Sequence, residues 1–146
     1  MKNLTKVRLL VVVPLCLGII IYAGTRSEML FLNQFFSSVG GHYIRIFFHD
    51  VIGQIHIPYW IIYSLPDALW MLALMMTILM IWNFKLDAKS IPWIIGSVSI
   101  GLFFEFGQAL HIITGTFDVT DLLFILIGAS IPVLFTLVKF RLWKTN

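Results

Sequence analysis

Three polar side chains recur at every third position of one apolar segment: Glu105, Gln108 and His111. If the segment is helical, this spacing places them on about one third of the helix circumference. A carboxyl beside an amide suits general acid or base catalysis, with Glu105 moving a proton and Gln108 orienting it. Ser97 and Gly101 continue the stripe as small residues, which favours close approach of another helix. The stripe is therefore the first candidate site.

Three aspartates lie near the ends of apolar segments: Asp67, Asp118 and Asp121. We expect them, with His111, to surround the outer mouth of a cleft that contains Glu105 and to bind a ligand there. Asp118 and Asp121 could instead cap the start of the fourth segment. A metal site of His111, Asp118 and Asp121 would suit zinc or manganese, although its spacing is not diagnostic.

The sequence identifies neither a reaction nor a cofactor. Serine nucleophile motifs, glycine-rich phosphate loops, zincin helices and paired cysteines are all absent from it. Its single cysteine, Cys16, can form neither an intrachain disulfide nor a thiolate metal site. Whether the chain is an enzyme therefore stays open, and Glu105 and Gln108 are only candidate catalytic residues.

The elements that must position these residues are indicated by composition. Hydrophobic residues make up 60% of the 146 residues and charged residues 12%, which excludes a water-soluble domain. Four apolar runs have about the length of a membrane span: 7–24, 60–82, 91–113 and 122–138. We predict an all-α integral membrane protein, one domain over residues 1–146 with four transmembrane helices. A cleavable signal peptide is the alternative for the first run, but Ile21 and Tyr22 fit a cleavage site poorly.

The basic residues set the predicted orientation. A cytoplasmic N-terminus puts eight of the ten Lys and Arg residues inside and only Arg26 and Arg45 outside. The C-terminus is then cytoplasmic as well. The eight inside residues are Lys2, Lys6, Arg8, Lys85, Lys89, Lys139, Arg141 and Lys144. Because they form short clusters beside apolar runs, they indicate topology and not nucleic-acid binding.

The same orientation gathers other polar groups on the outer side. All four histidines and six of the seven acidic residues fall there, with Asp87 alone inside. The positive-inside rule does not require this distribution of acids and imidazoles. We therefore interpret the outer polar groups as the functional signal.

Residues 25–58 connect the first two spans and are too polar to cross a membrane. Helical spacing puts an apolar face opposite a polar one, which predicts an amphipathic helix in the outer interface. The polar face holds His42, His49 and His56 at seven-residue intervals. The helix is either an anchor only or a lid that holds histidines such as His49 and His56 above the acids as ligand-binding groups.

Residues 100–130 resemble the VanZ-like family of small bacterial membrane proteins. The resemblance is carried by Glu105 to Gln108, then Gly115 to Asp121, then Gly128 and Ala129. Gly115 stands where the family has an arginine and Ile125 where it has an asparagine, so this chain is similar to a divergent member. Membership would imply a role in the envelope of a bacterium, at the inner membrane, in low-level resistance to the glycopeptide teicoplanin.

Three functions remain open. The leading hypothesis is an envelope protein whose outward-facing cleft binds, and could modify, a lipid-linked precursor or a glycopeptide in the outer leaflet. The second is a proton- or metal-coupled small transporter that uses Glu105 as the carrier. The third is a non-catalytic subunit, or a homodimer, that packs through Ser97 and Gly101 against another membrane protein.

Overall fold

The chain folds into helices. The computed structural model describes residues 2–25, 38, 43, 46–47, 50–51, 57–113 and 116–144. Within these residues it forms five helices and no strand: α1 (Lys2–Thr25), α4 (Tyr59–Tyr63), α5 (Leu65–Ile81), α6 (Ile91–Ala109) and α7 (Val119–Lys144). Of the predicted interfacial segment, His42, His49 and His56 lie outside the described residues, whereas residues 43, 46–47 and 50–51 are helical.

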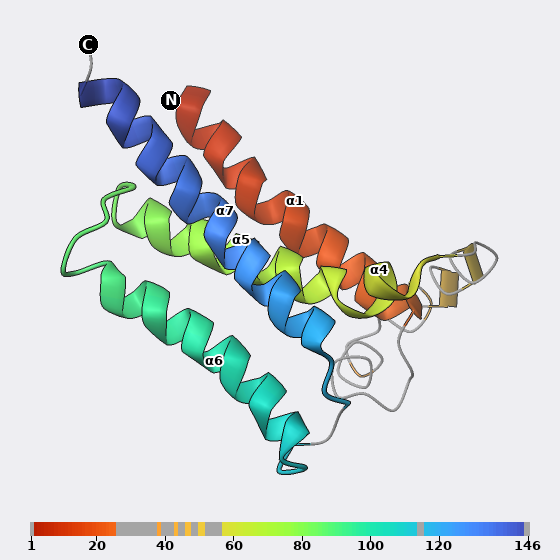
Figure 1. The fold of residues 1–146 in the computed structure, drawn as a ribbon. Coiled ribbons are helices and arrows are strands. Elements are labelled where there is room, and N and C mark those ends of the chain that lie inside the picture. The colour runs from red at the N-terminus through yellow and green to blue at the C-terminus, as the bar shows by residue number, and fades with distance from the viewer. Residues whose placement is uncertain are drawn as a thin grey trace.

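Helix α5 is the centre of the bundle and packs against α1, α6 and α7 (Figure 1). Its buried face carries Met75 and Leu79, which have no exposed surface. Met71 and Met75 join Ile125 and Ala129 of α7 in an apolar core. Flexible methionine side chains fill the irregular space between the helices. The core therefore lies mainly between α5 and α7, with α6 covering one side.

A glycine brings α1 and α5 together. A Cβ at Gly18 would lie 2.7 Å from Cδ1 of the Trp70 indole, so the ring occupies the space that a side chain would take. The rings of Tyr22 and Trp70 pack with centroids 5.3 Å apart. Aromatic pairs at such distances stabilise packing beyond their buried area. Gly18 thus lets α1 lie directly against α5.

An even closer approach joins α5 to α7. A Cβ at Gly128 would meet the Ala68 carbonyl oxygen and would lie 3.0 Å from Ala68 Cα. Because these neighbours are backbone atoms, they cannot rotate away as a side chain could. Glycine at position 128 is therefore required for the two backbones to meet here.

The second predicted span is broken near its start. Helix α4 ends at Tyr63 and α5 begins at Leu65, with Pro66 in its first turn. Pro66 has no backbone N–H to donate to the Ile62 carbonyl, which interrupts the helical hydrogen-bond pattern between the two helices. Ser64 occupies the N-cap position of α5, but its side chain makes no capping hydrogen bond.

Ser90 likewise occupies the N-cap position of α6 without a side-chain cap bond. Its hydroxyl donates to the Asp87 carbonyl oxygen at 3.2 Å and accepts from the Asp87 N–H at 3.0 Å. The Asp87 carboxylate accepts from the N–H groups of Lys89 and Ser90. Asp87 and Ser90 together, and not Ser90 alone, order the connection between α5 and α6.

Helix α6 ends earlier than the apolar run does. The run continues to residue 113, but the helix stops at Ala109, and His111 has a φ of 59° in the left-handed region. The Gly107 carbonyl then accepts hydrogen bonds from Ile112 and Ile113, whose side chain covers Gly107. His111 is thus exposed and is not part of the helical stripe. Glu105 lies about 6 Å from the helix end, at about 1.5 Å per residue, and not the roughly 12 Å that a helix through residue 113 would give.

Two helices are long and apolar enough to cross a membrane, Ile91–Ala109 and Val119–Val138. The apolar parts of α1 and α5, Leu9–Thr25 and Leu65–Ile81, are shorter. Their 17 residues are at the lower end of the range that spans a hydrocarbon core. Large apolar side chains such as Ile100, Phe103 and Leu134 are more than half exposed on the outside of the bundle.

We predict that Gly128→Ala destabilises the bundle, whereas Gly96→Ala does not. The added methyl group at position 128 meets backbone, and overpacking of this kind costs about 1–3 kcal/mol. Nothing lies within 4 Å of a Cβ at Gly96, where alanine gains helix propensity. Thermal unfolding in detergent should show a lower melting temperature for the first variant only. Equal melting temperatures for the two variants would contradict the close approach.

Candidate functional site

Three carboxyl groups from three helices meet at one end of the bundle. Asp67 is in the first turn of α5, Glu105 is near the end of α6, and Asp121 is in the first turn of α7. One carboxylate oxygen of each lies within 4.8 Å of the others. These helix ends gather away from the chain termini in Figure 1. We call Asp67, Glu105 and Asp121 the carboxylate triad.

The triad is largely removed from solvent. Glu105 is 5% exposed and Asp121 is 7% exposed, while Asp67 is partly buried. In the described part of the chain, Oδ1 of Asp121 is buried and makes no hydrogen bond. A buried polar atom without a hydrogen bond is costly and is rare in folded proteins. Asp121 therefore presents an acceptor that a bound group could use.

The spacing of the triad restricts its charge. Two carboxylates 4.8 Å apart repel by about 3 kcal/mol at an effective dielectric constant of about 20, and burial adds a desolvation cost. The first turns of α5 and α7 offset part of this cost, because helix N-termini stabilise negative charge. Three carboxylates in this arrangement are suited to sharing a proton, to holding a cation, or to accepting hydrogen bonds from a ligand.

The close contact at Gly128 positions Asp121. The two residues are seven apart on α7, so they lie two turns apart on the same face. Gly128 meets Ala68, which directly follows Asp67. On α6, a Cβ at Gly101 would lie 2.9 Å from Met71 Cε and 3.2 Å from Ile125 Cγ2. Glycines on two helices therefore allow the packing that brings the triad together.

Asp118 has a different role. Its carboxylate accepts a hydrogen bond from the Thr120 N–H at 2.8 Å, just before α7 begins. This bond lowers the pKa of Asp118 below its usual value. Asp118 is not a member of the triad. Both aspartates were predicted as caps or as ligands. Asp118 caps the start of α7, and Asp121 belongs to the carboxylate triad.

The other predicted site residues lie apart from the triad or outside the described residues. His111 is exposed beyond the end of α6, and Gln108 is partly buried one turn after Glu105. His49 and His56 are not among the described residues. The predicted metal set of His111, Asp118 and Asp121 is thus not assembled, whereas Asp67, Glu105 and Asp121 are.

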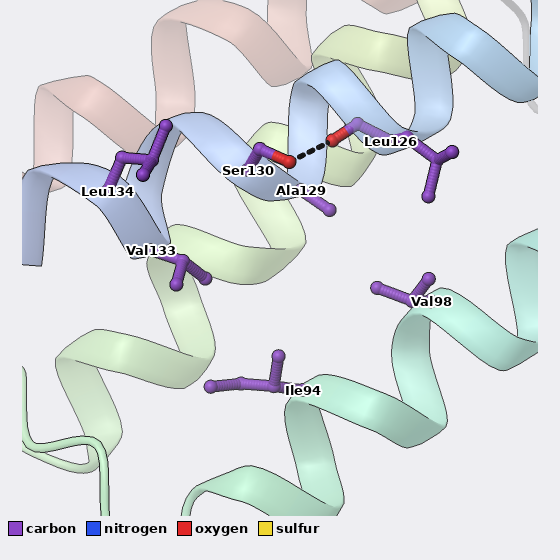
Figure 2. A pocket seen from close by; sticks show the side chains of 7 residues that line it. All are labelled: Ile94, Val98, Leu126, Ala129, Ser130, Val133 and Leu134. Carbon is purple, nitrogen blue, oxygen red and sulfur yellow. Dashed lines mark hydrogen bonds between the residues drawn. The ribbon is translucent and has the colours of Figure 1, made fainter.

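An apolar groove runs between α6 and α7. It has a volume of about 290 Å³ and is open on one side. Figure 2 shows Ile94 and Val98 of α6 facing Ala129 and Val133 of α7 across it. Leu126, Ser130 and Leu134 complete the lining, with the Ser130 hydroxyl donating to the Leu126 carbonyl at 2.6 Å. The groove offers an apolar surface with little polar chemistry.

Sequence analysis did not identify this groove or the contact at Gly128 as part of a site. It also named Ser64 in no candidate site. Ser64 Oγ is fully buried, makes no hydrogen bond among the described residues, and lies one turn before Asp67. Its position three residues before an acidic residue at the start of an apolar helix is the signal that could have drawn attention to it.

The Asp118 cap predicts a pH-dependent difference between Asp118→Asn and the wild type. The folded pKa of Asp118 lies below its unfolded value, so its charge stabilises the fold above the unfolded pKa. That stabilisation is lost as pH falls through the folded pKa. Asparagine keeps a capping oxygen but no charge, so the variant should melt a few degrees lower at pH 7 only. A difference in melting temperature that persists at a pH where Asp118 of the wild type is fully protonated would contradict this explanation.

In comparisons with family models, curated proteins and solved structures, nothing matches this chain. The resemblance to VanZ-like proteins therefore stays a prediction, and the geometry of the carboxylate triad carries the functional argument.

Proposed function

We propose that the chain is a multi-pass membrane protein of the bacterial envelope that binds a lipid-linked precursor in the outer leaflet. In this proposal α1, α5, α6 and α7 are the four spans, and both termini are cytoplasmic. The observation that carries the proposal is the carboxylate triad, which three helices assemble at one end of an apolar bundle.

The arrangement of the helix ends supports the orientation. In Figure 1 the start of α1, the end of α7 and the α5–α6 connection lie toward one end of the bundle. Those segments contain all eight basic residues that the positive-inside rule assigns to the cytoplasm. The carboxylate triad is built from the opposite ends of α5, α6 and α7. The triad then faces the outer side.

The groove supports a lipid as the ligand. Ile94, Val98, Gly101 and Glu105 follow one another at three- and four-residue steps on one face of α6. Val98 and Glu105 are seven residues apart, or about 10 Å along the axis. An isoprenoid chain in the groove would therefore leave its headgroup near the triad. Carboxylates there would accept hydrogen bonds from the hydroxyl and amide groups of a carbohydrate or peptide headgroup.

The VanZ-like resemblance adds an expected phenotype, lowered susceptibility to teicoplanin. A glycopeptide is the other ligand that this resemblance implies. If the bound ligand is also modified, Glu105 would act as the general acid or base and Gln108 would orient it. The proposal itself requires only binding.

A cation- or proton-coupled transporter is the second candidate, and the triad is the observation that favours it. Buried carboxylates between helices mark ion and proton paths in many membrane proteins. Flux of protons or metal ions in proteoliposomes would distinguish transport from binding. The third hypothesis, a subunit that docks through Ser97 and Gly101, gains less support. Gly101 faces Met71 and Ile125 inside the bundle, and Ser97 donates to the Trp93 carbonyl.

The topology predicts opposite accessibility for two connections. Cys16 is the only cysteine, so Cys16→Ser gives a background for single-cysteine labelling. We expect an impermeant maleimide to label Thr116→Cys in intact spheroplasts and to label Ala88→Cys only after the membrane is opened. Both positions are exposed, and Ala88→Cys leaves the neighbouring lysines in place. The reverse pattern would contradict the proposed orientation.

Ligand binding is tested with two probes, a polyprenyl-linked disaccharide peptide and the polyprenyl phosphate without that headgroup. Ser130→Phe should fill the groove and weaken binding of both probes by about ten-fold, since it removes space for the shared chain. Glu105→Gln should weaken binding of the first probe more than binding of the second, because only the first carries the carbohydrate and peptide groups that would bond to the carboxylate. In cells, it should also remove any decrease in teicoplanin susceptibility that the wild type confers.

The matched control is Ile131→Phe, which adds the same ring at a half-exposed position of α7 outside the groove. Native mass spectrometry of the purified chain gives the bound fraction of each probe. Binding that is unchanged in Ser130→Phe and Glu105→Gln, or absent from the wild type, would refute the proposed function.

A further inference from the structure

We propose that the carboxylate triad is a binding site for a hard divalent cation, with Ca²⁺ the closest match in size. The ligands are one or more carboxylate oxygens each from Asp67, Glu105 and Asp121. Oxygen-only ligand sets of this kind favour Ca²⁺, Mg²⁺ and Mn²⁺ over softer metals. His111 and Asp118, which the sequence suggested as ligands, are not part of this site.

The separation of the three oxygens agrees with a shared ion. Three atoms that all lie within 4.8 Å of one another share a central point no more than about 2.8 Å from each. Ca²⁺ binds oxygen at about 2.3–2.6 Å, and Mg²⁺ at about 2.0–2.1 Å. A shift of a few tenths of an ångström in the side chains is therefore enough for Ca²⁺. Mg²⁺ requires a larger contraction.

A second observation points to a bound group. Asp121 is more than nine-tenths buried, and its Oδ1, in the part of the chain that the structure describes, makes no hydrogen bond. A proton shared between carboxyl groups would engage such an oxygen in a hydrogen bond. A cation would instead take up its lone pairs directly. The position of Asp121 in the cluster therefore favours a cation over a shared proton.

Electrostatics also favour a divalent ion. If all three carboxylates are ionised, the triad carries three negative charges, and a divalent cation reduces this to one. The ion adds three attractions at shorter distance, which outweigh the three repulsions between the carboxylates.

The cation would also explain how an acidic site can receive a phosphate-containing lipid, and this consequence alone rests on the proposed function. Divalent ions commonly bridge carboxylates and substrate phosphates, using coordination positions that water otherwise fills. The cation site itself requires no lipid. It can be measured on the full chain in a neutral detergent.

The site is tested by isothermal titration calorimetry. The purified full chain is first treated with a chelator and then titrated with CaCl₂. We expect one Ca²⁺ per chain, and about ten-fold or greater loss of affinity in Asp121→Asn, because ligand charge sets affinity in such sites. The control is Asp118→Asn, which removes an equal charge three residues away and outside the triad. Its affinity should stay within about two-fold of the wild type.

If Asp121→Asn does not fold, Asp67→Asn provides the same comparison at a partly buried position. Ca²⁺ should also raise the melting temperature of the wild type and of Asp118→Asn, but not of the folded triad variant. No binding by the wild type, or equal affinities in the triad variant and the wild type, would overturn the inference. If the wild type binds Ca²⁺ but binds neither lipid probe, the result would count against the proposed function alone.

Discussion

The direct contact between the backbones of α5 and α7 is the constraint on which the carboxylate triad depends. At Gly128 no side chain separates α7 from the first turn of α5, where a Cβ would meet Ala68. Asp67 precedes Ala68, and Asp121 lies two turns before Gly128 on the same face of α7. A wider separation of the two helices would move these aspartates apart. The glycine thus sets the geometry of a site to which it contributes no side chain.

Two electrostatic effects oppose each other in this geometry. Bringing Asp67, Glu105 and Asp121 within 4.8 Å costs repulsion and desolvation, while the N-terminal ends of α5 and α7 stabilise negative charge on the two aspartates. The packing of Met71, Met75, Ile125 and Ala129 beside them stabilises the bundle that holds the acids in place. An uncompensated cluster of this kind would be among the first parts of the fold to separate. The proposed cation would remove that tendency.

Much of the helical architecture follows from sequence, because apolar runs of sufficient length predict helices. The boundaries follow less well, since they depend on local backbone conformation. His111 adopts a left-handed conformation that a sequence usually signals with a glycine, and none stands at this position. The third member of the predicted stripe therefore falls outside α6. The members of the triad were all recognisable as acids in apolar surroundings. That the three carboxyl groups lie close together could not be predicted, because it depends on tertiary packing at Gly101 and Gly128. The same applies to the α6–α7 groove, whose lining residues have ordinary apolar side chains.

The central claim is that one carboxyl group from each of α5, α6 and α7 shares a single site. The chain has only seven acidic residues, so ¹³C-labelled aspartate and glutamate give few carboxyl signals. Magic-angle-spinning NMR of the labelled protein in lipid bilayers measures their proximity most directly. The account predicts cross-peaks that join the Glu105 side-chain carboxyl carbon to those of Asp67 and Asp121, with none to Asp118. A spectrum in which Glu105 contacts neither aspartate, or contacts Asp118 in their place, would contradict it.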